Sequence, residues 1–179
     1  MSSVAPFLVF FIGAALVVGT SGILRSLVML AIPVVGAVNL YMLPADASHV
    51  VPLLGYELEL IKVDKLSLLF GYLFHLAAFL GIVFSLHVDD RVQHVSGLLY
   101  AGSALGAVFA GDLLTLFLFW ELLAVTSVFL ILARGTERSY GAAMRYLLIQ
   151  VGSGVILLAG IDMHWKATGS TAIAHIGLQ

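Results

Sequence analysis

The sequence predicts an all-α integral membrane protein with about six transmembrane helices and a short external β-ribbon. Two observations support this fold class. Of the 179 residues, 61% are hydrophobic and only 10% carry a charge, whereas soluble domains carry about 25% charged residues. The mean hydropathy is +1.12, and six apolar runs approach the length of about 20 residues that a helix needs to cross a bilayer.

The first half of the chain holds three of these runs. They cover about Ala5 to Ile23, Leu27 to Met42 and Leu66 to His87. Arg25 falls in the tight turn between the first two runs, and Pro33 lies inside the second. Because a proline removes one helix hydrogen bond, we expect a kink at Pro33 whose freed carbonyl is satisfied by a neighbouring helix.

A longer connection, from residue 44 to residue 65, separates the second run from the third. Within it, apolar and acidic residues alternate along Tyr56-Glu57-Leu58-Glu59-Leu60. A period of two is typical of a strand with one exposed face. We therefore predict a small ribbon outside the membrane.

The second half holds the other three runs, joined by short connections. They cover about His94 to Ala110, Asp112 to Ala133 and Tyr140 to Ile161. Asp112 is expected to cap the fifth helix, because a carboxylate there meets free backbone amides. No linker or repeat divides residues 1–179, so we expect a single membrane domain.

The basic residues sort by side once six spans are threaded through the membrane. One face receives five arginines and the other three lysines: Arg25, Arg91, Arg134, Arg138 and Arg145 against Lys62, Lys65 and Lys166. Positive charges in short loops mark the cytoplasmic side. We predict that the protein lies in the cell (inner) membrane with its arginine face toward the cytoplasm. Both termini and the 44–65 segment are then expected to be external.

Glu121 is the only ionisable residue between Asp112 and Arg134. It lies roughly 13 Å along the helix from Asp112, near the centre of a hydrocarbon core about 30 Å thick. An acid at that depth costs on the order of 3 kcal/mol and usually faces a partner or a water-filled path. We expect a proton-handling role; the alternative is a protonated carboxyl that is hydrogen-bonded for packing.

His75 and Arg145 are the other candidates for a proton path. His75 lies near the depth of Glu121, and its imidazole can exchange a proton near neutral pH. Alternatively, it donates a single interhelical hydrogen bond. Arg145 lies about one and a half turns into the sixth run, where the simpler interpretation is a side chain that snorkels to the interface.

Several chemistries are not expected. The chain has no cysteine, which excludes disulfides, thiolate ligands and cysteine nucleophiles. The Gly-Ser-Gly step at 152–154 follows no strand, so it predicts helix packing and not a phosphate-binding loop. We therefore predict no metal, no cofactor and no nucleic-acid partner, and any electron transfer takes place in another subunit.

Three segments resemble the antiporter-like subunits of respiratory complex I, Mrp-type cation/proton antiporters and membrane-bound hydrogenases. They are Phe119-Trp120-Glu121-Leu122, which is similar to the Phe-Trp-Glu-Leu helix of that family, Val63-Asp64-Lys65-Leu66-Ser67 before its third helix, and Tyr140-Gly141-Ala142-Ala143-Met144-Arg145-Tyr146 with Gly152-Ser153 in its sixth.

The resemblance implies a subunit of an ion-translocating complex in which Glu121 is the helix-five glutamate and Arg145 the basic residue of helix six. In that family the glutamate pairs with a lysine on a seventh helix. This sequence ends at Gln179, before such a helix, so it resembles the first part of a family member and lacks the second repeat. The partner of Glu121 is then His75 or a group on another polypeptide.

Two function classes follow. The first is a subunit that translocates protons, alone or in exchange for Na⁺, together with other membrane subunits in the lipid bilayer. The second is a non-transporting structural or assembly subunit, or a fragment, that keeps the glutamate as a packing remnant. The sequence predicts no active site of its own, and membership of an NADH-quinone oxidoreductase-type complex stays open.

Overall fold

The computed structural model describes residues 4–44, 47–53 and 56–173. Within these ranges it contains six helices and one two-stranded sheet. Their bounds are α1 Pro6–Val18, α2 Gly22–Tyr41, β1 Ser48–Leu53, β2 Tyr56–Lys62, α3 Lys65–Ser85, α4 Arg91–Phe109, α5 Leu113–Leu132 and α6 Glu137–Thr168. The predicted helices and the predicted ribbon are confirmed.

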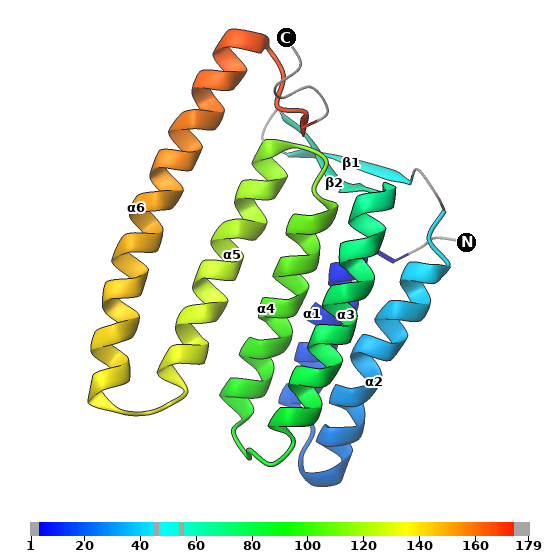
Figure 1. Cartoon of the computed structure of the whole chain (residues 1–179), viewed down its shortest axis with the longest axis vertical. Coiled ribbons are helices and arrows are strands. Elements are labelled where there is room, and N and C mark those ends of the chain that lie inside the picture. The colour runs from blue at the N-terminus through cyan, green and yellow to red at the C-terminus, as the bar shows by residue number, and fades with distance from the viewer. Residues whose placement is uncertain (1–3, 45–46, 54–55, 174–179) are drawn as a thin grey trace.

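The first four helices pack in a ring, in which α1 contacts α2 and α4, and α3 contacts α2 and α4. Beyond this ring, α5 packs on α4 and α6 packs on α5, so that the helices continue outward in chain order (Figure 1). The best-buried side chains come from α1 and α4, among them Phe10, Leu105 and Phe109, each 0% exposed. The core therefore lies in the ring, and α6 is the outermost helix.

Four helices, α2, α3, α5 and α6, are long and apolar enough to cross a membrane. The chain is therefore a multi-pass membrane protein. Helix α1 is apolar but has only 13 residues, and α4 carries Arg91, Gln93 and His94 in its first turn. That these two helices also span stays a prediction. Helix α6 runs to Thr168, past the expected end at Ile161.

Strands β1 and β2 pair antiparallel, with a bulge between His49 and Val50. The residues between the strands lie outside the described part of the chain. The predicted alternation holds at Glu57, which is exposed, and at Leu58, which is 5% exposed. It fails at Glu59, which is half-buried because it faces the start of α5.

The Asp112 side chain joins two segments at the ribbon end of the bundle. Its Oδ1 accepts hydrogen bonds from the backbone amides of Leu114 and Thr115, at 2.9 Å each. Its Oδ2 accepts from the Thr115 hydroxyl at 2.6 Å and from the Glu59 amide of β2 at 2.7 Å. Asp112 is 3% exposed. The predicted helix cap is confirmed, and the same carboxylate also holds the ribbon.

The chain after α6 returns to this junction. The Leu113 amide donates to the Thr171 carbonyl at 2.8 Å, and the Gly111 amide donates to the Glu59 carbonyl at 2.9 Å. The ribbon, the start of α5 and the segment beyond α6 are thus linked at one end of the bundle (Figure 1).

At the opposite end, Arg25 corrects a detail of the sequence analysis. The structure places it in the first turn of α2 and not in the preceding turn. Its guanidinium pairs with Asp89 at 2.8 Å, and the residue is only 8% exposed. This ion pair ties the start of α2 to the loop between α3 and α4.

Replacing Asp112 by alanine is expected to lower the free energy of unfolding by about 3 kcal/mol, because the cap is lost and buried donors are left unpaired. Asp90 is a matched control, since it caps α4 through the amides of Val92 and Gln93 but stays partly exposed. Asp90→Ala should cost only about 1 kcal/mol. Thermal unfolding in nanodiscs measures both, and equal losses would contradict the junction.

Candidate functional site around Glu121

Glu121 lies in the middle of α5, which runs from Leu113 to Leu132. The residue is half-buried, but its Oε1 atom is shielded and has no hydrogen-bond partner. Among the described residues, only one other buried side-chain atom shares this property, Nε2 of His75. A buried polar atom without a partner is costly and marks a place where a proton, a water or a further group can bind.

Gly154 of α6 forms the wall beside the carboxyl group. It is buried, and a Cβ atom at this position would overlap Oε1 of Glu121. The absence of a side chain therefore allows the carboxyl group to lie against the α6 backbone. A second contact joins the same helices, because the Ser127 hydroxyl donates to the Tyr146 hydroxyl at 2.9 Å.

Gly154 is a neighbour of Glu121 that the sequence pattern does not reveal. Its only signal is the Gly-Ser-Gly step, which predicts helix packing. That prediction holds for Gly154, whereas a Cβ at Gly152 would meet nothing within 4 Å. Spacing alone does not tell these two glycines apart.

His75 lies in a different part of the bundle. It is 2% exposed on α3, with its Nδ1 atom 2.7 Å from the Gly71 carbonyl. A carbonyl can only accept, so Nδ1 carries the hydrogen and Nε2 is the nitrogen with a free lone pair. Nε2 faces Gly36 of α2, and the ring stands edge-on to Phe10 of α1 at 5.3 Å between centroids.

The structure does not bring Glu121 and His75 together. The imidazole faces α1 and α2, the carboxyl group faces α6, and α4 packs against both α3 and α5. Arg145 is exposed on α6. It lies about 13 Å along the helix axis from Gly154, given the rise of about 1.5 Å per residue. Within the described ranges, neither residue forms an ion pair with Glu121.

A carboxyl group in this setting has two stable states. It can stay neutral and keep a proton, or it can ionise when a cation or a basic side chain is close by. The α5–α6 interface supplies a sterically defined position for the first state. A partner for the second state is not found among residues 4–44, 47–53 and 56–173.

Comparisons with known proteins identify relatives of this chain. The model of the family described as NADH:quinone oxidoreductase/Mrp antiporter, transmembrane, matches residues 110–179. One subunit of the Na(+)/H(+) antiporter of Alkalihalophilus pseudofirmus is 32% identical over 133 residues, which is 70% of this chain and 16% of that protein. One subunit of the NADH-quinone oxidoreductase of Escherichia coli is 30% identical over 131 residues, which is 66% of this chain and 26% of that protein.

Two solved structures share the fold. One polypeptide of the Mrp complex from Dietzia sp. DQ12-45-1b superposes with a TM-score of 0.80 at 25% identity, covering 97% of this chain and 20% of that one. One polypeptide of an archaeal membrane-bound sulfane sulfur reductase superposes with a TM-score of 0.70 at 19% identity. The match covers 96% of this chain and 37% of that one. The sequence thus spans only part of the length of its relatives. It belongs to the antiporter-like membrane subunits of the complex I and Mrp antiporter family.

Proposed function

We propose that the chain forms part of a subunit that translocates protons, alone or in exchange for Na⁺, and that Glu121 is the protonatable site. The observation that carries this proposal is the shielded, unpartnered Oε1 in the middle of a candidate membrane span. An intramembrane acid is expensive unless it serves an ion path. Two relatives, which belong to a Na(+)/H(+) antiporter and to an NADH-quinone oxidoreductase, support the same function.

The ionised state of Glu121 requires a basic group from outside the described residues. Such a group would approach along the side of α5 and α6 that the described chain leaves open. Only 11% of the apolar 18-residue stretch of α6 is buried. Arg145, exposed on α6, is proposed to lie on the cytoplasmic approach to this site. His75 is proposed as a separate protonatable group, because it does not contact Glu121.

The low burial of α6 also supports assembly with other membrane subunits. We propose a multi-chain complex in a cell (inner) membrane, with the ribbon and the end of α6 on the external side. The arginine-bearing loops lie at the opposite end of the bundle (Figure 1), which suits the cytoplasmic side.

A structural or assembly role is the second candidate function. It is favoured by the lack of an ion pair between Glu121 and any basic side chain in the described part of the chain. In that case the carboxyl group would remain protonated and serve only packing against Gly154. Transport measurements separate the two functions.

Glu121→Gln is expected to abolish proton or sodium flux in vesicles that contain the assembled complex, because an amide keeps the shape of the side chain but cannot release a proton. The matched control is Glu57→Gln on the exposed face of β2, which should leave flux unchanged. His75→Ala is expected to reduce flux less than Glu121→Gln. Normal assembly with full flux in Glu121→Gln would eliminate the proposed function in favour of the structural one.

Gly154→Ala is expected to displace the carboxyl group of Glu121 and to expose it. The flexible side chain can yield, so stability should change by less than about 1 kcal/mol. The rate at which a hydrophobic carbodiimide modifies Glu121 should rise at least about two-fold, since more of the group is reachable. Gly160→Ala is the control, because a Cβ there meets open space. Equal rates in both variants would contradict the contact.

Cysteine labelling tests the orientation, and the absence of native cysteine removes background. Glu57→Cys in the ribbon should react with a membrane-impermeant maleimide on intact cells. Arg138→Cys, exposed in the first turn of α6, should react only after permeabilisation. The reverse pattern would invert the proposed orientation.

A further inference from the structure

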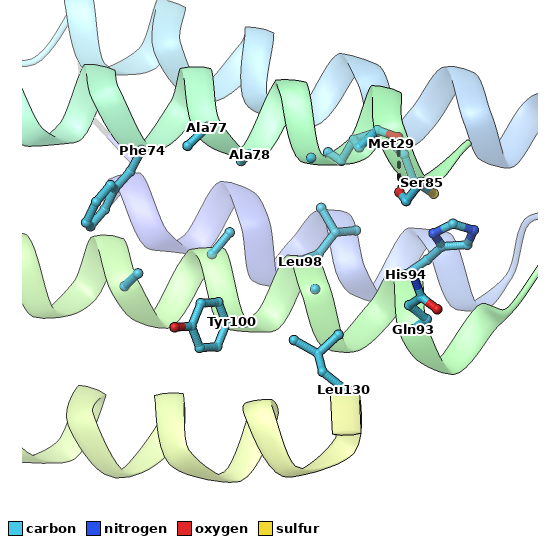
Figure 2. A pocket seen from close by; sticks show the side chains of 15 residues that line it. Met29, Phe74, Ala77, Ala78, Ser85, Gln93, His94, Leu98, Tyr100 and Leu130 are labelled. Carbon is cyan, nitrogen blue, oxygen red and sulfur yellow. Dashed lines mark hydrogen bonds between the residues drawn. The ribbon is translucent and has the colours of Figure 1, made fainter. Parts of the chain in front are cut away.

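A cavity of about 470 Å³ lies between α3 and α4 in the half of the bundle away from the ribbon. Figure 2 shows Phe74 at one end, Gln93 and His94 near the other, and Ala77, Ala78 and Leu98 between them. Met29 of α2 and Leu130 of α5 complete the lining. The cavity is distinct from the site around Glu121, which lies between α5 and α6.

Small residues on both helices create this space. Ala77, Ala78 and Gly81 line it from α3, and Gly97, Ala101 and Ala104 line it from α4. Small residues at such spacing usually let two helices approach closely. Here they do not, because a Cβ at Gly81 or at Gly97 would meet nothing within 4 Å. An apolar cavity of this size is unfavourable when empty, so a ligand or a neighbouring molecule is expected to fill it.

Apart from Tyr100, the cavity is lined by apolar side chains along most of its length, and it is polar at one end. Ser85, Gln93 and His94 line the end where α3 stops and α4 begins. The Ser85 hydroxyl already donates to the Ile82 carbonyl at 3.0 Å, and Nε2 of His94 to the Val88 carbonyl at 2.8 Å. The Gln93 amide group has no side-chain hydrogen bond within the described ranges and can bind a polar group at the opening.

Charged side chains of both signs lie next to this opening, since Asp89 pairs with Arg25, Asp90 caps α4 and Arg91 follows them. Arg91 is exposed in the first turn of α4, three residues before His94, and residues at this spacing are neighbours on a helix surface. Unlike Arg25, Arg91 makes no ion pair among the described residues. Its guanidinium can pair with a phosphate, which it contacts through two parallel hydrogen bonds.

The length of the cavity matches one leaflet of a bilayer. From Phe74 to Ser85 the helix rises roughly 16 Å, which is about half of a hydrocarbon core about 30 Å thick. The apolar end thus lies near the bilayer centre, and the polar end lies at headgroup level.

We propose that this cavity binds one acyl chain of a phospholipid from the leaflet at the arginine-bearing end, with the lipid phosphate at Arg91 and Gln93. The apolar walls accept the chain, the small residues supply its width, and the exposed Arg91 guanidinium, which makes no ion pair among the described residues, can contact the phosphate. The bound lipid fills the gap between α3 and α4 and so stabilises the ring of helices α1 to α4. This site does not depend on proton transfer at Glu121.

Photo-crosslinking tests the proposal in the assembled complex in nanodiscs. The probe is a phosphatidylglycerol with a diazirine on one acyl chain, and phosphatidylcholine with the same chain serves for comparison. Adducts are expected to concentrate on residues 74–85 and 93–104, as located by mass spectrometry of peptides. Labelling spread evenly over the outer faces of α2 and α6 would show ordinary boundary lipid and overturn the proposal.

Filling the cavity provides the matched variants. The double variant Gly81→Leu/Gly97→Leu places two side chains in the open space and should lower the adduct yield roughly five-fold without unfolding, since leucine also favours the helix. Gly141→Leu on α6, where a Cβ also meets open space, should leave the yield unchanged. An unchanged yield in the double variant would overturn the site.

The headgroup contact has its own test. Arg91→Gln should remove a preference for phosphatidylglycerol over phosphatidylcholine, while the adducts stay within the same peptides. An unaltered preference would refute the phosphate contact at Arg91. The alternative occupant is a helix of another polypeptide, and a bifunctional reagent attached at Gly97→Cys tests for it. Cross-linking to another polypeptide would show that a partner helix fills the cavity, and this result would overturn the lipid proposal.

Discussion

The buried carboxylate of Asp112 is the interaction on which the positions of α5 and α6 depend. It accepts hydrogen bonds from the first turn of α5 and from strand β2, so it fixes where α5 begins relative to the ribbon. That starting point sets the depth of Glu121, because a helix rises by a constant step. The strand-like pairing of residues 111–113 with the segment beyond α6 then brings the outermost helix back to the same junction. A local cap thereby determines the geometry of a site more than two turns away.

The elements of the fold could be predicted because their signals are local. Apolar runs, the alternation around Leu58 and the carboxylate at Asp112 each reflect residues close in sequence. The helices and the cap agree with the structure, and the alternation agrees at Glu57 and Leu58 but not at Glu59. The interhelical contacts could not be predicted in the same way. The ion pair of Arg25 with Asp89 and the contact of Glu121 with Gly154 join residues far apart in sequence. From the sequence, His75 is predicted as a partner for Glu121 because the two residues lie at similar depths along their helices. Depth alone does not determine which neighbouring helix each side chain faces.

In the proposed function, Glu121 is part of a site to which the described chain contributes the acid and one wall. The acid comes from α5, and Gly154 supplies the backbone surface against which it rests. The same proposal assigns the rest of the surroundings to groups outside the described residues, and the low burial of α6 leaves room for them. If Glu121 exchanges a proton as proposed, no hydrogen bond at Oε1 has to be broken first, because the carboxyl group is held there by shape.

The length of α6 has a mechanical consequence. Its 32 residues extend for roughly 48 Å, well beyond a hydrocarbon core about 30 Å thick. The helix must therefore tilt strongly or project into water, and its last turns carry the exposed pair of Asp162 with Lys166 that suits the second solution. A projecting helix is a stiff rod with one end accessible to water and its middle against Glu121. Because Gly154 lies near the middle of this rod, any change in the tilt of α6 would also move the backbone surface against which the Glu121 carboxyl group rests.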